Sequence, residues 1–493
     1  MTISKSKYMA GVQCLKRLYL LVHEPELGTG KSAADFALMD QGRQVGKIAH
    51  QLFPGGVEVR TGEPEEAIRI TRELLENPDV PAIFEAAFDD GVFVRVDILH
   101  RRQDRRWRLI EVKSSASLKV EHLEDVAIQY RVVSKSGLDV ASCCLAHVNR
   151  NYVFLGGNID ARQFFRIKNL TRKVEVLQPK LTFQLRSELR VLAMPKAPDL
   201  PTGPHCTYPV TCEFFDLCNP PRPPDHVGFL PRIHANAVEE LKEMGVESIR
   251  DIPDDFDLTE IQRRACASTK TGEPYLGSEL SNELSGLKYP LYFMDFETVN
   301  PAIPRFSGMR PYDQLPFQWS VHVQRQPKAE LEHYEFLAPD ARDPRREFIT
   351  SLCDVLAQRG SILVYSGFES QRLADLAAWL PEHGERIKQI QARLFDLLPV
   401  VRKHVYHPAF AGSYSLKAVL PALVPEMTYD GMEVGNGQDA GLAWESLIRA
   451  TGDQAESDRL RKALLDYCGQ DTLALLRLFE ALRHRPIQHN NTQ

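Results

Sequence analysis

Residues 291–298 have the sequence Leu-Tyr-Phe-Met-Asp-Phe-Glu-Thr, and this stretch decides the fold class of the second half of the chain. The apolar run predicts a buried β-strand, which Asp295 and Glu297 interrupt. Because successive side chains of a strand point to opposite faces, these two acids project from the same face. Carboxylates on a buried face need a cation. The stretch therefore predicts a strand of an α/β sheet that takes part in a metal site.

Later segments supply further acids in the order that such a site requires. An apolar strand predicted from Ile362 is followed by a turn and Glu369, and Asp396 is a second candidate for a supporting acid. Tyr467 and Asp471 are four residues apart in a helical segment, so they share one face of that helix.

This order of motifs resembles the DEDD exonucleases of the RNase H-like fold, in their tyrosine subclass. The resemblance implies an RNase H-like domain over residues 286–485. It also implies that Asp295, Glu297, Glu369 and Asp471 hold two Mg²⁺ or Mn²⁺ ions while Tyr467 positions the attacking water. The family usually has Asp where this chain has Glu369. A longer arm that still reaches a metal ion and a weakened or lost activity both remain open.

The first half of the chain contains a second group of candidate catalytic residues. Strands are predicted at 83–88, 92–99 and 107–113, followed by a helix at 121–133. Asp97 lies near the end of one strand, and Glu111 and Lys113 lie two apart on the next. We expect all three side chains to converge. Two carboxylates suit Mg²⁺ or Mn²⁺, and the lysine can orient a water molecule. The alternative is a solvated Glu-Lys pair on an exposed strand.

The Asp…Glu-x-Lys pattern resembles the PD-(D/E)XK nuclease superfamily, whose fold is that of the restriction endonucleases. In RecB-like members a helix histidine after a glycine is a metal ligand, and His50 matches that place. Gln129 resembles the glutamine of the superfamily's Gln-x-x-x-Tyr signature, although position 133 is Val. A structural role for His50 is the alternative.

Four of the nine cysteines have the spacing of a ligand set. Cys206, Cys212 and Cys218 are evenly spaced in a segment bounded by prolines, and Cys14 precedes the predicted strands. One cysteine before the nuclease core and three after it resembles the iron–sulfur nucleases of the RecB family. The resemblance implies a [4Fe–4S] cluster with a structural role. Zinc, with His205 as a further candidate ligand, is the alternative.

Composition limits the class of protein. The chain has 493 residues, 43% hydrophobic and 26% charged, with a net charge of −6, which argues against non-specific coating of nucleic acid by the whole surface. It lacks an apolar run of the roughly 18 residues that a membrane helix needs, so we expect a soluble, cytoplasmic protein without membrane partners. The five arginines between positions 101 and 108 crowd one predicted hairpin, where they either track a phosphate backbone or are solvated.

The expected organisation is an α/β protein with a PD-(D/E)XK restriction-endonuclease-like domain at 1–222 and an RNase H-like domain at 286–485. A small helical segment at 226–285 joins them, either a helix-hairpin-helix or a plain spacer, and 486–493 form a polar tail. The expected function is a metal-dependent DNA nuclease in repair, recombination or defence, acting on single strands or free ends. The alternatives are an RNA-processing exonuclease and a catalytically decayed nucleic-acid-binding scaffold.

Overall fold

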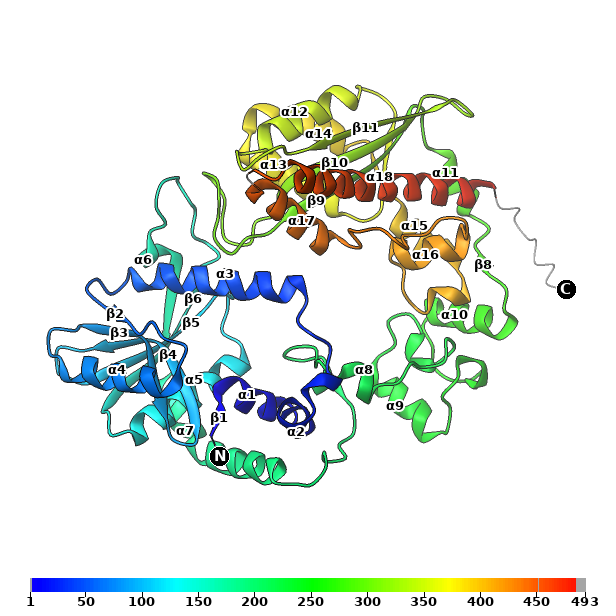
Figure 1. The fold of residues 1–493 in the computed structure, drawn as a ribbon. Helices are drawn as coiled ribbons and strands as arrows, with labels where there is room; N and C mark the ends of the chain where they lie inside the picture. The colour runs from blue at the N-terminus through cyan, green and yellow to red at the C-terminus, as the bar shows by residue number, and fades with distance from the viewer. Residues whose placement is uncertain (1, 451, 485–493) are drawn as a thin grey trace. The chain divides into compact units, whose positions relative to one another are not determined.

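The computed structural model describes residues 2–450 and 452–484, so the tail predicted at 486–493 lies outside the described residues. The chain forms two compact units, whose elements are labelled in Figure 1. Unit 1 contains the residues up to Pro221 together with Asn300–Asp313, and unit 2 contains Arg222–Val299 together with the residues from Gln314 onward. Both units combine β-sheets with helices, which confirms the α/β class.

Unit 1 is built on a seven-stranded sheet in the order β2-β3-β4-β5-β6-β7, with β1 pairing with β4. Strands β3, β4 and β5 form an antiparallel meander, and α5 then connects β5 to the parallel strand β6. The strands predicted at 83–88, 92–99 and 107–113 are confirmed as β3, β4 and β5. The elements of this sheet and its helices are β1 (Ile3–Ser4), α1 (Lys5–Gln13), α2 (Leu15–His23), α3 (Ala33–His50), β2 (Val57–Glu58), α4 (Pro64–Glu76), β3 (Ala82–Asp89), β4 (Val92–Arg101), β5 (Trp107–Lys113), α5 (Val120–Lys135), β6 (Val140–Val148), α6 (Ala161–Phe164), β7 (Phe165–Asn169), α7 (Thr171–Leu192) and α8 (Phe215–Cys218).

Alternation along β5 places the helices of unit 1 on opposite faces of the sheet. Leu109 belongs to the core formed with Val126 and Val132 of α5. Its neighbour Ile110 belongs to the core formed with Val45 of α3. Helices α3 and α5 therefore cover opposite faces, because adjacent strand residues point in opposite directions.

A strap from the second half of the chain completes the core under α3. Within Asn300–Asp313, Ala302 and Met309 are fully buried, and Ala302 belongs to the same core as Ile110. The backbone N–H of Ala302 donates to the Gln41 side chain at 2.8 Å, and the N–H of Phe154 donates to the Met309 carbonyl at 2.9 Å. The prediction of one contiguous unit over 286–485 therefore differs from the structure, because this apolar segment buries its side chains in unit 1.

Unit 2 is built on a five-stranded sheet in the order β11-β10-β9-β12-β13. Strands β9, β10 and β11 are antiparallel, whereas β12 and β13 run parallel to β9. A second, two-stranded sheet pairs β14 with β8. The elements are α9 (Ala235–Glu243), α10 (Glu260–Thr271), β8 (Tyr275–Leu276), α11 (Leu280–Ser285), β9 (Leu291–Val299), β10 (Leu315–Gln324), β11 (Leu331–Leu337), α12 (Arg345–Val355), β12 (Ser361–Val364), α13 (Phe368–Trp379), α14 (Gly384–Gln391), β13 (Leu394–Asp396), α15 (Leu397–His404), β14 (Val405–Tyr406), α16 (Leu416–Leu423), α17 (Gly437–Arg449) and α18 (Gln454–His484).

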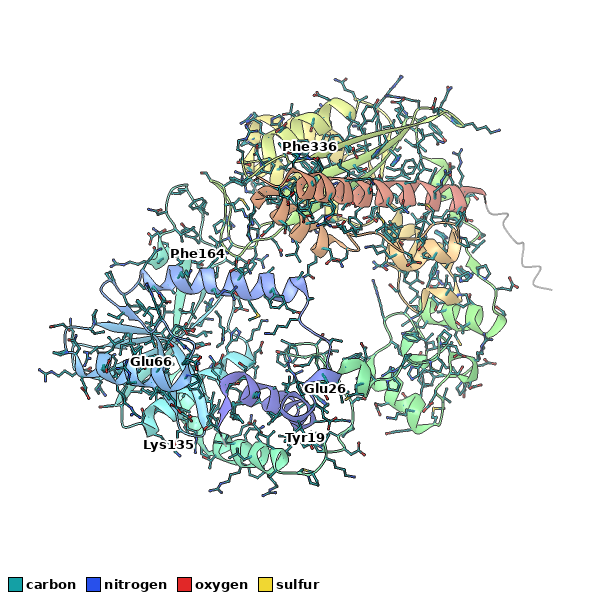
Figure 2. The ribbon with its side chains drawn as sticks, viewed as in Figure 1. Tyr19, Glu26, Glu66, Lys135, Phe164 and Phe336 are labelled. Atoms are coloured by element: carbon teal, nitrogen blue, oxygen red, sulfur yellow. The ribbon has the colours of Figure 1, made fainter. Side chains whose placement is uncertain are left out.

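The central strand β9 separates two cores. Tyr292 and Met294 pack with residues of α12, α13 and α14. On this face Phe336 of β11, labelled in Figure 2, meets Phe348 of α12 edge to face at 5.9 Å between ring centroids. Phe293 points the other way, into the core that contains the buried residues of α18. Asp295 and Glu297 share the face of Phe293, so they point toward α18.

The segment predicted as a linker at 226–285 belongs to unit 2. Leu241 and Ile249 are buried in the same core as Phe293, so the segment is part of the fold and not a free spacer. Helix α9 is followed by a glycine turn at Gly245 and then by a single 3₁₀ turn, Ile249–Asp251, where the hairpin prediction expects a short helix. None of the described helices combines the length and the apolarity needed to span a bilayer.

Candidate metal centre and a second carboxylate site

Three carboxylates meet between β9 and α18 in unit 2. Asp295 and Glu297 project from β9, and Asp471 projects from α18. Each offers an oxygen atom, and these atoms all lie within 4.8 Å of one another. This group corresponds to the first and third predicted motifs, which the structure brings together.

Burial and mutual repulsion disfavour the ionised forms of these acids. Glu297 is 6% exposed, and burial, followed by the charge of Asp471, raises its pKa to about 8. Burial also raises the pKa of Asp295, and the charges of Asp471 and Glu297 raise it further. Asp471 is buried as well, and its pKa is raised by that burial. A divalent cation supplies the missing positive charge, so the group fits Mg²⁺ or Mn²⁺.

Glu369 lies in the first turn of α13, beside this group and outside it. The side chain is 3% exposed, and its Oε2 atom is buried without a hydrogen-bond partner among the described residues. Burial raises the pKa of Glu369 to about 8, and a side-chain hydrogen bond links it to Asp295. An unpartnered buried oxygen is the feature expected of a ligand whose cation is missing. Asp396, the other predicted acid, caps α15 by accepting a hydrogen bond from the N–H of Leu398 at 2.9 Å.

Two tyrosines and a lysine surround Asp471. The hydroxyl of Tyr429 donates to Asp471 Oδ1 at 2.6 Å, and Tyr467 lies one helical turn before Asp471 on α18. The ammonium of Lys417 donates to the Tyr467 hydroxyl at 3.0 Å and lies 4.9 Å from the centroid of that ring. Lys417 therefore holds the predicted Tyr467 beside the carboxylates. The sequence analysis missed Tyr429, because it lies in a loop without periodicity.

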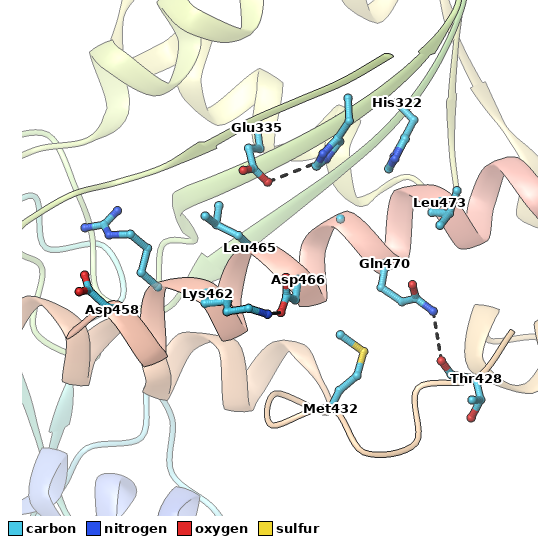
Figure 3. Close-up of a pocket in the computed structure, with 13 residues that line it drawn as sticks. His322, Glu335, Thr428, Met432, Asp458, Lys462, Leu465, Asp466, Gln470 and Leu473 are labelled. Atoms are coloured by element: carbon cyan, nitrogen blue, oxygen red, sulfur yellow. Dashed lines mark hydrogen bonds and ion pairs between the residues drawn. The ribbon is translucent and has the colours of Figure 1, made fainter. Parts of the chain in front are cut away.

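A pocket of about 780 Å³ is lined by residues of α18 and of its neighbours, and these do not include the three carboxylates (Figure 3). Gln470 lines it and donates to the Thr428 carbonyl at 3.1 Å. His322 also lines it, and its ring bonds Thr472, the residue after Asp471, at 2.8 Å. The lining residues are His322, His333, Glu335, Thr428, Met432, Asp458, Arg461, Lys462, Leu465, Asp466, Gly469, Gln470 and Leu473. None of these lining residues belongs to the group of Asp295, Glu297 and Asp471, so the pocket and the carboxylate group are separate features.

In unit 1 the predicted Glu111, Lys113 and Gln129 also meet. Lys113 Nζ is 2.6 Å from Glu111 Oε1, and Gln129 Nε2 donates to Glu111 Oε2 at 2.7 Å. Asp97 lies beside them and accepts the N–H of Val112 at 2.6 Å. Burial, followed by the charge of Glu111, raises the pKa of Asp97.

Two residues of this site were missed by the sequence analysis. Lys5, from the start of α1, is 2.8 Å from Asp125 Oδ1, and Asp125 Oδ2 is 2.6 Å from Lys113. Burial alone lowers the pKa of a lysine, yet the carboxylates of Glu111 and Asp125 raise the pKa of Lys113 well above its usual value. The i, i+4 spacing of Asp125 and Gln129 is a signal that the sequence carries. The ammonium groups occupy the place of a cation, so a divalent ion does not fit this arrangement as it stands.

The structure does not bring His50 into this site. Its ring stacks on Phe84 at 3.9 Å between centroids, and the charges that act on it are those of Glu58 and Lys47. Helix α3 covers the sheet face opposite to α5, whereas Gln129 of α5 bonds Glu111. The prediction of His50 as a metal ligand of this site therefore differs from the geometry. The sequence pattern does not show which face of the sheet α3 covers.

The four predicted cysteine ligands line one small pocket in unit 1. Cys14, His205, Cys206, Cys212 and Cys218 all border it. Gln13 ties α1 to this segment by donating to the carbonyls of His205 and Val210 at 2.7 and 2.8 Å. A zinc ion bound by four thiolates holds its sulfurs about 3.8 Å apart, and no three cysteines of the described residues have ligand atoms within 4.8 Å of one another. The described residues therefore show no preformed cysteine metal site, and both the cluster and the zinc alternative stay predictions.

The arginine-rich hairpin is held by its own interactions. Arg101 lies 4.3 Å from the centroid of Trp107 and donates to the carbonyls of Leu75 and Asn77. Arg102 and Arg106 both pair with Asp104. Three of the five arginines therefore have protein partners, and the phosphate-tracking and solvated alternatives for this hairpin both stay predictions.

Comparisons with known proteins match parts of the chain. A family described as a domain of unknown function (DUF2779) matches residues 292–415, a range that includes Asp295, Glu297 and Glu369. The chain is 25% identical over 212 residues to the uncharacterized protein UU173 of Ureaplasma parvum serovar 3. That alignment covers 38% of this chain and 31% of the relative, so the chain spans about a third of the relative's length. No solved structure matches the chain.

The raised pKa values in unit 2 predict a stability that depends on pH and metal. Glu297 and Glu369 have folded-state pKa values of about 8, above the unfolded value near 4.3. The folded state therefore binds more protons between about pH 4.5 and 8, and metal-free protein loses stability as pH rises through this window. Mn²⁺ requires ionised carboxylates, so the stabilisation that it provides increases over the same window.

Thermal unfolding from pH 5.5 to 8.5, in chelator and in Mn²⁺, measures both trends. We expect Glu297→Gln to flatten the pH dependence in chelator and to weaken the Mn²⁺ effect. Glu330→Gln, which removes an exposed acid, serves as the control. Equal slopes for the wild type and Glu297→Gln would contradict the assignment.

Proposed function

We propose that unit 2 is a metal-dependent nuclease that hydrolyses phosphodiester bonds of nucleic acid, with DNA as its substrate. The observation that carries this proposal is the group formed by Asp295, Glu297 and Asp471, whose oxygens lie together on a buried face. Burying like charges is unfavourable unless a cation neutralises them, and functional sites are where such arrangements persist. Lys417 is the cation that faces this group, and its ammonium is bonded to the Tyr467 hydroxyl.

The topology of unit 2 supports the resemblance to RNase H-like exonucleases. An antiparallel meander of three strands, with two further strands running parallel to β9 on its other side, is the sheet expected of that fold. In this arrangement Asp295 and Glu297 lie on the central strand, and Glu369 begins the helix after β12. The final helix α18 packs against β9 and β10 and brings Asp471 beside Asp295 and Glu297. The meeting of the first and third motifs, which are far apart in sequence, supports the proposal.

Each residue of the site has a defined part in the proposed chemistry. Asp295, Glu297 and Asp471 would hold divalent ions, with Glu369 as a further ligand. When bound, such ions lower the pKa of water and stabilise charge on the leaving oxygen. Tyr467, whose hydroxyl accepts a hydrogen bond from Lys417, lies one turn before Asp471 on α18, where it would orient water. Tyr429 fixes the rotamer of Asp471 through its 2.6 Å hydrogen bond.

The topology of unit 1 supports its resemblance to the PD-(D/E)XK superfamily. Three antiparallel strands, a helix and a parallel strand follow one another as in the nuclease core, with Glu111 and Lys113 at the end of the third strand. Its carboxylate site differs from that of unit 2, because Lys5 and Lys113 already neutralise the acids. We therefore assign the proposed hydrolysis to unit 2.

The cysteine pocket supports a [4Fe–4S] cluster in unit 1. Cys14, Cys206, Cys212 and Cys218 would hold it, with His205 beside them. Such a cluster would tie α2 to the segment that ends unit 1, which is a structural role. The Arg17–Glu213 ion pair at 2.7 Å already connects these two parts of the chain.

Removal of one unit 2 carboxylate predicts loss of cleavage. The assay uses end-labelled single- and double-stranded DNA and RNA with Mg²⁺ or Mn²⁺. We expect Asp471→Asn to lower the cleavage rate by at least about 100-fold, because the substitution removes an oxygen that would bind the metal ion directly. Asp466→Asn, the same change at an exposed position of α18, serves as the matched control, since Asp466 pairs only with Lys462 in the described contacts.

Four outcomes of this assay distinguish the candidate functions. Cleavage of RNA alone would favour the RNA-processing alternative, and binding without cleavage would favour the scaffold. Cleavage that survives Asp471→Asn and disappears in Lys113→Met would assign the activity to unit 1 and overturn the proposal. Cleavage of DNA that is lost in Asp471→Asn and retained in Lys113→Met is the result that we expect.

The cluster assignment predicts metal content and stability. Anaerobically purified wild type should contain about four iron atoms and four sulfides per chain. Cys212→Ser should lose the iron and lower the unfolding temperature, while Cys353→Ser, in unit 2, should change neither. Elemental analysis provides the measurement, and zinc without iron in the wild type would replace the cluster by the zinc alternative.

A further inference from the structure

Every oxygen of the two acids at the centre of the unit 1 site already has a partner. Glu111 Oε1 faces both ammonium groups, Lys5 at 3.1 Å and Lys113 at 2.6 Å. Its Oε2 accepts from Gln129 at 2.7 Å. Asp125 Oδ1 faces Lys5 at 2.8 Å and Gln129 at 2.8 Å, and Oδ2 faces Lys113 at 2.6 Å. Two carboxylates and two ammonium groups therefore form a closed, neutral arrangement.

The two lysines reach this arrangement by different routes. Lys113 follows Glu111 by two residues on β5, so the two side chains lie on the same face of the sheet. Lys5 arrives from the beginning of the chain, through the two-residue parallel strand β1 that pairs with Val92 and Phe93 of β4. The ladder is extended by one bond, from the N–H of Ile3 to the Gly91 carbonyl at 3.2 Å. The backbone of Lys5 begins α1, in which Tyr8 and Ala10 are buried, whereas its side chain is 23% exposed.

The comparison with unit 2 shows what Lys5 replaces. There Asp295, Glu297 and Asp471 meet without an ammonium group inserted between their oxygens in the described part of the chain, and they form a candidate metal site. In unit 1 the same kind of carboxylate pair holds a lysine where a divalent ion would be expected. An ammonium ion and a metal ion compete for the same carboxylate oxygens, so both cannot occupy them together.

We propose that Lys5 is a tethered cation that occupies the metal position of the unit 1 carboxylate site, so that a divalent ion binds Glu111 and Asp125 only when Lys5 withdraws. The Lys5 side chain then acts as a latch on this site, and it withdraws by changing its own conformation while α1 stays in place. This inference rests on the proposed nuclease character of the chain for its biological meaning. Its geometry and its test depend only on cation binding at Glu111 and Asp125.

Mn²⁺ binding by full-length protein tests the latch. All variants carry Asp295→Asn and Asp471→Asn, which remove the unit 2 centre, and bound Mn²⁺ is measured by electron paramagnetic resonance. We expect Lys5→Met to bind one more Mn²⁺ per chain, at least about tenfold more tightly than the parent. Lys7→Met, two residues along the same helix, is the matched control and should equal the parent. Adding Glu111→Gln to Lys5→Met should abolish the extra ion.

A second measurement needs no substitution at Lys5 and so covers the case in which Lys5→Met fails to fold. Lysines of the wild type are acetylated briefly with and without Mn²⁺, and the modified positions are quantified by mass spectrometry. Withdrawal of Lys5 predicts a several-fold rise in its labelling with Mn²⁺, with Lys7 unchanged. Unchanged labelling of Lys5 at saturating Mn²⁺, or equal Mn²⁺ binding by folded Lys5→Met and Lys7→Met, would overturn the latch. Neither readout involves cleavage, so failure of the latch and failure of the proposed nuclease function are separable.

Discussion

Charge compensation of buried carboxylates is the constraint on which both candidate sites depend. Taking an ionised carboxylate out of water costs several kcal/mol unless an opposite charge or strong hydrogen bonds replace the lost solvation. Unit 1 meets this cost with two lysines and Gln129, which leave no oxygen of Glu111 or Asp125 without a partner. Unit 2 meets it only in part, through tyrosine hydroxyls and the field of Lys417. The carboxylates of unit 1 are therefore neutralised by the protein itself, whereas those of unit 2 still need a positive charge.

The sequence predicts those parts of the sites that local periodicity determines. Alternation along β9 predicts that Asp295 and Glu297 share a face, and the four-residue spacing predicts the same for Tyr467 and Asp471. The helix after Glu111 and Lys113 also lies where its pattern indicates. These predictions succeed because each depends on a single element, and because apolar neighbours determine which face of that element is buried.

The parts that the sequence does not predict depend on pairing between distant elements. Lys5 enters the unit 1 site because β1 and α1 pack against β4, a strand almost ninety residues later in the chain. His50 leaves that site because α3 covers the other face of the sheet, and no local pattern distinguishes the two faces. Tyr429 reaches Asp471 from a loop, where neither helical nor strand periodicity applies. Long-range pairing therefore decides which side chains complete each site.

The strap Asn300–Asp313 shows that the two units are not consecutive pieces of chain. It leaves unit 2 directly after β9 and returns at the start of β10, where Leu315 pairs with Val299. Ala302 and Met309 are nevertheless buried in unit 1. A fragment that ends at Pro221 therefore lacks part of its own core, and a fragment that begins at Arg222 carries an apolar loop without its packing partners. Functional tests consequently require the full chain.

The central claim is that Asp295, Glu297 and Asp471 form a centre for divalent cations. Anomalous diffraction from crystals of the full chain soaked in Mn²⁺ tests it most directly, because it locates the ion without reference to any activity. We expect a peak bounded by these three carboxylates that disappears in Asp471→Asn crystals. A map without a peak at these carboxylates, from crystals in which Mn²⁺ is visible elsewhere, would contradict it.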